Sequence, residues 1–322
     1  MAPRLIGDIG ATNARFALAD AEGRIEDPRV FADDDYSDIE TAIEAYLVAS
    51  RAAAPQEAAL AVASPITGDL VTLTNHPWTF SISRLKQRLG LARLLVVNDF
   101  TANALAMPRL GPSDRIPVGG GEPVADTPIA VLGPGSGLGM GAVVPTPTGW
   151  MALPGEGGHQ TMPAADAREA AVLDQLRRRF DHVSAERVLS GQGLVNLYQT
   201  LAGLDGALAA PLTPAQITDR VIGESDRHAR DAVAMFCAML GTIAGSLALT
   251  LGARGGVYIA GGIVPRLGPT FVASDFRARF EAMGRFRTYL AAIPTYVVTH
   301  PTPAFPGLVA LLEQAPAETA GH

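Results

Sequence analysis

The chain has 322 residues, of which 48% are hydrophobic and 18% charged, and its formal net charge is −7 at pH 7. This length suggests about two domains. The acidic balance gives no electrostatic footprint for nucleic acid, because binding to a phosphate backbone draws on clustered Lys and Arg. The single cysteine, Cys237, excludes an intrachain disulfide and any zinc site built from several cysteines.

Residues 5–18, LIGDIGATNARFAL, place an acidic residue and small turn residues between two apolar runs. The pattern predicts a strand near 4–7, a tight turn, and a strand near 14–19. Glycine lets another group approach the backbone, and free N–H groups of a turn can donate to phosphate oxygens. The candidate phosphate-binding residues are Gly10, Ala11, Thr12 and Asn13. Asp8 is the candidate partner of Mg²⁺ through water, since Mg²⁺ keeps several waters; a plain hairpin turn is the alternative.

The next segments predict a helix near 37–51 and strands near 59–63, 70–74 and 93–97. Strands and helices do not strictly alternate in this order, which indicates a mixed sheet. The last of these apolar runs ends in Asn98 and Asp99. A carboxylate there can accept the proton of an attacking hydroxyl, so Asp99 is the candidate catalytic residue. Alternatively, the two residues cap a helix that begins around Thr101.

A stretch containing many glycines and prolines, residues 108–128, marks the best domain boundary, with a hinge near 110. Residues 129–144, IAVLGPGSGLGMGAVV, then repeat the pattern of apolar run, glycine-dense turn and apolar run. A dinucleotide fingerprint would open a helix, and a P-loop would need Gly-Lys, which this chain lacks. A second phosphate turn is therefore predicted, with candidate residues Gly133, Gly135, Ser136 and Gly137.

Glu156 and His159 lie three residues apart in a glycine-rich loop, where their side chains can converge on a small ligand. A carboxylate accepts hydrogen bonds from hydroxyls, and a neutral imidazole both donates and accepts, so this pair suits a sugar. A metal site is the alternative, but no third ligand lies nearby in the sequence. Glu186 lies near a predicted helix start, where it can serve as a partner of the helix dipole.

The second half predicts helices near 165–180, 185–203, 214–222, 226–253 and 275–284, and strands near 129–133, 140–144, 256–260 and 295–298. Residues 232–253 carry no charge and contain Gly241-x-x-x-Gly245, which would suit a membrane helix by length. Their many small residues favour a core helix instead, with Cys237 an inert core residue. A final helix is expected near 306–314, followed by a disordered tail at 316–322.

Six motifs occur in the order seen in bacterial glucokinases, and the chain resembles that family from end to end. They are residues 7–15 (GDIGATNAR), 97–100 (VNDF), 132–139 (LGPGSGLG), 153–159 (LPGEGGH), 186–191 (ERVLSG) and 260–263 (AGGI). The resemblance implies an α/β actin-like ATPase fold with mixed sheets, in which two ribonuclease-H-like domains clamp a nucleotide in an interdomain cleft. The expected domains are 1–110 plus 301–322, and 111–300, with the last helix packed on the first domain.

The resemblance further implies an ATP-dependent transfer of phosphate to the 6-hydroxyl of D-glucose, with Asp99 as the base. The implied sugar-binding residues are Asn98, Asp99, Glu156, His159 and Glu186, and residues 64–69 and 74–76 are candidates for the border of that site. Gly261 and Gly262 can let the adenine approach the backbone, unless they only allow a helix to pack on a strand. ATP, Mg²⁺, a homodimer and a cytoplasmic location without nucleic-acid or membrane partners are also expected.

Two departures and two alternatives accompany this resemblance. The family often has Gly-Gly-Thr where this chain has Gly10-Ala11-Thr12, so Ala11 would be strained if that position needed a positive φ. The related ROK kinases and repressors usually carry a cysteine-rich zinc motif, which is missing after His159. A kinase for another hexose or an N-acetyl amino sugar is the alternative function, and a non-catalytic sugar sensor is a second one.

Overall fold

The computed structural model describes residues 2–74, 76–223 and 226–314. Asn75 and the predicted tail at 316–322 lie outside the described residues. The chain forms two compact units: the first contains the residues up to Leu110, Pro145–Pro154 and those from Pro301, and the second contains Gly111–Val144 and Gly155–His300. Residues 145–154 were expected in the second domain, but they pack with the first unit, to which the backbone carbonyl of Trp150 is joined by a hydrogen bond from Gln314.

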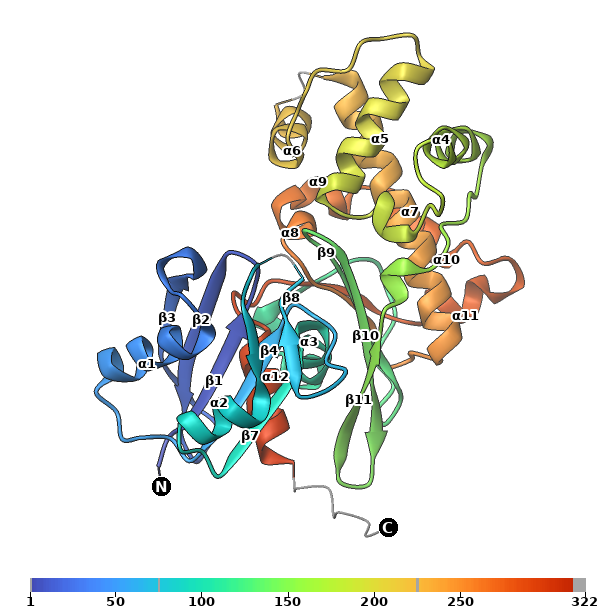
Figure 1. Cartoon of the computed structure of the whole chain (residues 1–322). Helices are drawn as coiled ribbons and strands as arrows, with labels where there is room; N and C mark the ends of the chain where they lie inside the picture. Colours follow the sequence, from blue (N-terminus) through green and yellow to red (C-terminus); the bar gives the residue numbers. More distant parts are fainter. Residues whose placement is uncertain (1, 75, 224–225, 315–322) are drawn as a thin grey trace. The chain divides into compact units, whose positions relative to one another are not determined.

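The first unit is built on a five-stranded mixed sheet, as expected, in the order β3-β2-β1-β4-β7 (Figure 1). Its strands are β1 (Arg4–Ile9), β2 (Asn13–Ala19), β3 (Ile25–Ala32), β4 (Glu57–Val62) and β7 (Arg93–Asn98). The first three are antiparallel neighbours, whereas β4 runs parallel to both β1 and β7. The predicted strand at 70–74 lies elsewhere, since β5 (Leu70–Thr72) pairs with β6 (Thr79–Ser81) in a separate two-stranded sheet.

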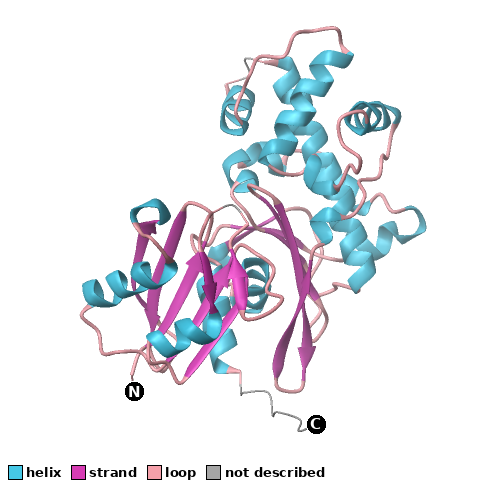
Figure 2. Ribbon diagram, in the orientation of Figure 1, coloured by secondary structure: helices cyan, strands magenta, loops and turns pink. Residues whose placement is uncertain are grey.

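Helices cover both faces of this sheet (Figure 2). On one face, α1 (Ile39–Ser50) and α2 (Ile82–Arg88) pack on a core that includes Phe16 and Leu60. On the other face, α3 (Asp99–Ala106) and α12 (Ala304–Glu313) pack on the smaller residues of β1, β2 and β4. The expected packing of the last helix on the first unit is thereby confirmed.

The second unit contains most of a six-stranded sheet in the order β11-β10-β9-β12-β13-β8, whose edge strand β11 falls almost wholly in residues 145–154 of the first unit. Its strands are β8 (Arg115–Pro117), β9 (Ile129–Pro134), β10 (Leu138–Thr146), β11 (Gly149–Gly155), β12 (Val257–Ile259) and β13 (Thr295–Val298). Strand β9 is antiparallel to β10 and parallel to β12, as β1 is antiparallel to β2 and parallel to β4. The predicted duplication of the strand-turn-strand element is therefore present in the topology of the two sheets.

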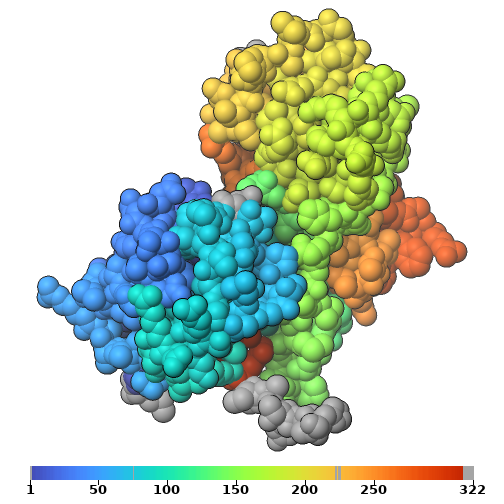
Figure 3. All heavy atoms as spheres, viewed as in Figure 1, coloured from blue at the N-terminus to red at the C-terminus, as the bar shows by residue number. Residues whose placement is uncertain are grey.

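The helices of the second unit are α4 (Ala167–Arg177), α5 (Gly191–Leu204), α6 (Pro214–Ile222), α7 (Arg227–Leu251), α8 (Ile263–Leu267), α9 (Pro269–Val272), α10 (Phe276–Glu281) and α11 (Arg287–Ala291). The helix predicted at 185–203 is wrong at its start. Residues Ala185–Arg187 form a 3-10 turn, η5, and α5 begins only after Ser190, whose Oγ accepts the N–H of Gly193 at 3.0 Å. Helices α4, α5 and α6 gather at one end of the unit (Figure 3).

Helix α7 is long and apolar enough to cross a membrane, but most of its apolar stretch is buried inside the second unit. Its small residues allow α10 to approach closely: a Cβ added at Gly245 would lie 2.5 Å from the carbonyl oxygen of Phe280. The expected core helix is thus confirmed. Cys237 is fully buried on it, and this burial raises the pKa of the thiol to about 12, as expected of an unreactive core cysteine.

Candidate active site

The carboxyl ends of three parallel strands in the first unit bring predicted site residues to one edge of the sheet. Ile9 of β1 pairs with Val62 of β4, and Val62 pairs with Asn98 of β7. Asp8 precedes Ile9, and Asp99 follows Asn98. Since neighbouring strands lie about 4.8 Å apart, the backbone of β1 at this edge is roughly 10 Å from that of β7. Asp8 and Asp99 therefore lie at the same edge of the sheet.

The turn between β1 and β2 has free hydrogen-bond donors. The N–H of Gly10 donates to the carbonyl of Asn13 at 3.1 Å and closes the turn. The N–H groups of Ala11 and Thr12 donate to no partner within the described residues. Ala11 does not have a positive φ, so it does not carry the backbone strain that a positive φ would cause. The turn can therefore present two backbone donors to an anion.

Asp8 is held opposite a positive charge. Strand register pairs it with Arg15 of β2, whose Nη1 lies 3.6 Å from the Asp8 Oδ2. The Asp8 side chain is 21% exposed. Burial raises its pKa, and the Arg15 guanidinium opposes this shift by favouring the charged carboxylate. A single, partly buried carboxylate beside a turn fits a hydrated Mg²⁺, which takes few protein oxygens directly.

No group of three or more His, Cys, Asp or Glu side chains within the described ranges could hold a metal ion directly. The pair Glu156 and His159 accordingly finds no third ligand there.

Asn98 has the helix-capping role considered for it. It is the N-cap of α3, which begins at Asp99 rather than at Thr101. Its Oδ1 accepts the N–H of Phe100 at 2.8 Å, and its Nδ2 donates to the carbonyl of Ser64 at 3.4 Å. The Asp99 Oδ1 also accepts the N–H of Phe100, at 2.9 Å. Helix capping thus fixes both side chains at the edge of the sheet where the reaction is predicted.

Ser64 ties the predicted border segments together. Its side chain is 3% exposed, and its Oγ accepts the N–H of Thr74 at 2.7 Å while its carbonyl accepts from Asn98. Residues 64 and 74 therefore lie beside Asn98 at the end of β7. Asn75 of the same border lies outside the described residues.

In the second unit, glycine segments far apart in sequence meet at the turn between β9 and β10. The N–H of Gly135 donates to the carbonyl of Gly137, and the N–H of Gly191 donates to the carbonyl of Gly135, both at 2.8 Å. Gly261 has φ +82° and packs so closely on Pro134 that a Cβ would overlap its carbonyl. The N–H groups of Ser136 and Gly137 donate to nothing in the described part of the chain, so this turn also offers two donors.

The remaining phosphate and adenosine candidates surround this turn. Gly133 pairs with Gly139 at the end of the β9–β10 ladder. Gly262 is the N-cap of α8, and a Cβ there would meet no atom within 4 Å, so the backbone is open on that side.

The predicted sugar residues of the second unit gather around Leu138. The Glu186 Oε2 accepts the N–H of Leu138 at 2.9 Å, and Gly158 packs against the carbonyl of Leu138. A hydrogen bond of 2.8 Å from the N–H of Ala185 to the carbonyl of Gln160 joins their two segments. The Glu156 and His159 side chains are exposed, and neither has a hydrogen-bond partner within the described ranges. Both are therefore available to a ligand.

Two residues at the site, Arg15 and Gly191, were not predicted to have a role there. The pairing of Arg15 with Asp8 follows from the register of a hairpin with a short turn, so its signal was present in the sequence. The N–H of Gly191 donates to the carbonyl of Gly135, which lies 56 residues earlier in the chain. No local sequence pattern predicts that contact.

Comparison with known proteins gives one consistent result. The family model described as Glucokinase matches residues 5–315. A glucokinase of Paramagnetospirillum magneticum is 56% identical over 310 residues, which cover 96% of this chain and 97% of that protein. The crystal structure of a glucokinase from an Antarctic psychrotroph has a TM-score of 0.90 at 37% identity and covers 98% of this chain and 100% of that one.

A more distant structure shares the fold. It is a ROK family glucokinase from Streptomyces griseus in complex with glucose and AMPPNP. Its TM-score is 0.65 at 20% identity, with coverage of 96% of this chain and 98% of that one. At this identity the likeness concerns the fold alone.

Proposed function

The chain belongs to the glucokinase family, and we propose that Asp99 is the general base in its transfer of the γ-phosphoryl group of ATP to the 6-hydroxyl of D-glucose. The observation that carries this assignment is the position of Asp99 on the first residue of α3, directly after β7. The N–H of Phe100 holds one carboxylate oxygen at 2.9 Å. A carboxylate so oriented can accept the proton of the sugar hydroxyl as that hydroxyl attacks the phosphorus.

Sugar recognition is assigned to Asn98, Glu156, His159 and Glu186 together with Asp99. Their carboxylates accept hydrogen bonds from hydroxyls, the amide and imidazole can do both, and the exposed pair Glu156 and His159 has unused capacity. Polar groups left unpaired by a sugar lacking a hydroxyl are costly, so a site of this kind selects strongly among sugars.

Phosphate binding is assigned to the two glycine turns, each of which offers two free N–H donors within the described ranges. Residues 10–13 and 133–137 would hold the phosphates, and Gly261 with Gly262 would face the adenosine. Mg²⁺, when bound, neutralises charge that develops on the phosphates, and Asp8 would hold it through water. Burial raises the pKa of Asp8, and the Arg15 guanidinium opposes that shift by favouring the charged carboxylate.

Three further assignments rest on the family resemblance. We propose that the two compact units, of which the first includes residues 145–154, are the functional domains. We also propose that the enzyme is a homodimer and that it acts in the cytoplasm. Sedimentation of the purified protein and fractionation of the source cells test the last two.

The decisive test compares glucose, mannose, fructose, galactose and N-acetylglucosamine at equal concentrations with ATP and Mg²⁺, and records ATP hydrolysis without sugar. We expect a large preference for glucose and little hydrolysis in its absence. A higher kcat/KM for another sugar would overturn the glucose assignment while leaving the residue roles intact. Binding of glucose without any phosphoryl transfer would instead indicate a sugar sensor.

A further inference from the structure

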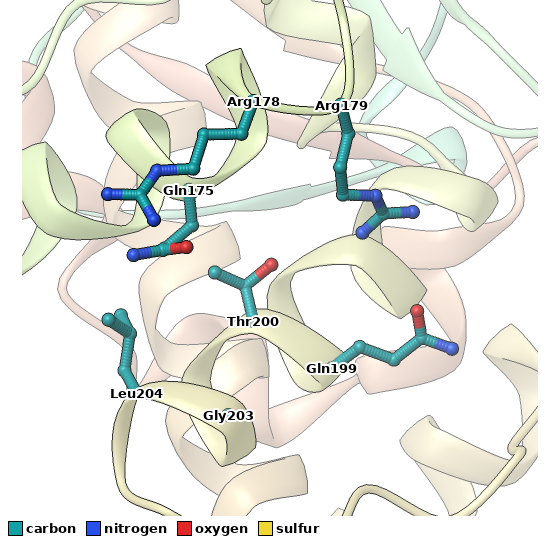
Figure 4. Close-up of a pocket in the computed structure, with 7 residues that line it drawn as sticks. All are labelled: Gln175, Arg178, Arg179, Gln199, Thr200, Gly203 and Leu204. Atoms are coloured by element: carbon teal, nitrogen blue, oxygen red, sulfur yellow. The ribbon is translucent and has the colours of Figure 1, made fainter.

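A polar pocket lies in the second unit, between α4 and α5. Its volume is about 400 Å³. Its lining is Gln175, Arg178, Arg179, Gln199, Thr200, Gly203 and Leu204 (Figure 4). Ligand pockets commonly have volumes of about 300–1,000 Å³, so this one suits a small metabolite. None of the residues proposed above to bind glucose or ATP belongs to it.

The charge of this pocket is opposite to that of the protein as a whole. Residues 177–179 are three consecutive arginines, the one run of adjacent basic residues in a chain of net charge −7. Two of them, Arg178 and Arg179, line the pocket, and no carboxylate is among its lining residues in the described part of the chain. The third, Arg177, lies outside the lining and forms an ion pair with Asp174. The pocket therefore carries two positive charges that no acidic neighbour in its lining offsets.

The polar groups of the pocket have unused hydrogen-bonding capacity. Figure 4 shows both guanidinium groups above the Thr200 side chain, with Gln175 and Gln199 on either side. The side chains of Arg178, Gln175 and Gln199 have no hydrogen-bond partner within the described ranges, and neither has the hydroxyl of Thr200, a residue only 9% exposed. These groups can therefore donate to, or accept from, a ligand that enters the pocket.

Arg179 is held in place by two contacts. Its Nη2 donates to Asn196 Oδ1 at 3.4 Å, and its guanidinium lies 5.2 Å from the centre of the Phe180 ring. Asn196 is itself fully buried, and its Nδ2 donates to the carbonyl of Arg187 at 2.9 Å. One guanidinium of the pocket is thus anchored to the core, while Arg178 is free to close on a ligand.

We propose that this pocket binds a small phosphate monoester of sugar size. Two guanidinium groups suit a phosphate dianion, because arginine donates to its oxygens in pairs. The amides of Gln175 and Gln199 and the hydroxyl of Thr200 suit the hydroxyls of the sugar. The volume accommodates a pentose or hexose phosphate, and the site is separate from the residues assigned to catalysis.

The test is a calorimetric titration of the full-length protein, already saturated with glucose and AMPPNP, with ribose 5-phosphate. Ribose and inorganic phosphate are titrated separately as the two halves of the probe. We expect saturable binding of one ribose 5-phosphate per chain, and weaker binding of either half. Prior saturation of the catalytic site separates this result from any failure of the glucokinase assignment.

Three variants locate the binding. Arg178→Gln combined with Arg179→Gln should weaken ribose 5-phosphate binding about tenfold or more, since each loses a charge-assisted contact. Thr200→Val should weaken it severalfold while preserving shape. Arg177→Gln is the matched control, because it removes the neighbouring charge outside the pocket. The affinity of this variant for ribose 5-phosphate should stay within about twofold of the affinity of the native protein.

Two results would overturn the proposal. One is the absence of saturable binding of ribose 5-phosphate to the blocked protein. The other is an equal loss in Arg177→Gln and in the double variant, which would indicate a diffuse charge effect. Thermal unfolding of each variant confirms that the fold is retained, which is expected because the substituted arginines are exposed.

Discussion

The Glu186 carboxylate accepts a hydrogen bond from the backbone N–H of Leu138 at 2.9 Å. A side chain assigned to sugar binding thus supports the first residue of β10, directly after the proposed phosphate turn. A Cβ added at Gly137 would lie 2.5 Å from the Glu186 Oε2, so only glycine leaves room for this carboxylate. The position of Glu186 therefore depends on the residue before Leu138.

We expect Gly137→Ala to displace Glu186 and to weaken glucose binding about tenfold or more, on the scale of a hydrogen bond to a charged group. Gly135→Ala is the control, because a Cβ there would meet no atom within 4 Å. Glucose titration without nucleotide isolates the effect from phosphate binding. Equal glucose affinities in the two variants would show that Glu186 does not depend on this glycine.

Replacing Asp99 by Asn should separate catalysis from binding. Asparagine keeps an oxygen that can accept the N–H of Phe100 but has no basic carboxylate. We expect the turnover number to fall by about 10²–10⁴, the usual contribution of a general base. The dissociation constant for glucose should change only a few fold. A near-normal turnover in Asp99→Asn would remove Asp99 as the base.

Asn98 offers a test of capping against sugar binding. Asn98→Ala removes one of the two acceptors for the N–H of Phe100, leaving Asp99 Oδ1, and should cost up to about 1 kcal/mol of the free energy of unfolding. Asn98→Asp keeps a good capping acceptor but loses the donor to the carbonyl of Ser64. We expect Asn98→Asp to retain most stability in urea unfolding while binding glucose less tightly. If it binds glucose as the native protein does, Asn98 serves only as a cap.

We expect the Asp8 carboxylate to lower the free energy of unfolding near neutral pH, although it is proposed to help hold Mg²⁺. Its pKa is raised by burial, so the folded state holds the proton more tightly than the unfolded chain, whose pKa is near the ordinary 3.8. Stability is therefore lost as pH rises from 3.8 through the folded pKa, and the loss is constant above it. Asp8→Asn removes this dependence.

We expect Asp8→Asn to be at least as stable as the native protein at pH 7, and to have a higher KM for ATP with Mg²⁺. Urea unfolding at several pH values measures the first effect, and initial rates at varied Mg²⁺ measure the second. The advantage of the variant should shrink as pH falls toward 3.8. A variant that is less stable than the native protein at pH 7 would contradict the expected sign of the stability change.

Two of the four described strands that the sequence did not predict occupy equivalent positions in the two sheets. Strands β3 and β11 occupy the same edge of the two duplicated sheets. The residues of both strands are mostly exposed or half-buried. Neither strand therefore has an apolar run like those from which β1, β4 and β9 were predicted. Edge strands pair on one side only and need less apolar surface. Buried elements were predicted closely, as β13 and α6 show by matching their expected bounds.

The types of residue at the candidate site could be predicted from the sequence, but the contacts between those residues could not. Asn98 and Asp99 end an apolar run, and that local pattern indicated both capping and catalysis. The bond between Glu186 and Leu138 joins residues 48 apart, and its existence depends on how η5 packs on β10. Such contacts depend on tertiary packing, which local periodicity does not specify.

Gly307 tests how firmly α12 holds the helix that carries Asp99. A Cβ at this position would overlap the carbonyl oxygen of Ala102 on α3, so the two helices meet backbone to backbone. We expect Gly307→Ala to lower the free energy of unfolding by about 1–3 kcal/mol through overpacking. Since α3 must shift to make room, turnover should fall as well. The matched control is Gly203→Ala on α5, where a Cβ meets nothing within 4 Å and the gain in helix propensity should stabilise by up to about 1 kcal/mol. Urea unfolding of both variants measures their free energies of unfolding. Equal values would mean that α12 can move away from α3 without a loss of stability.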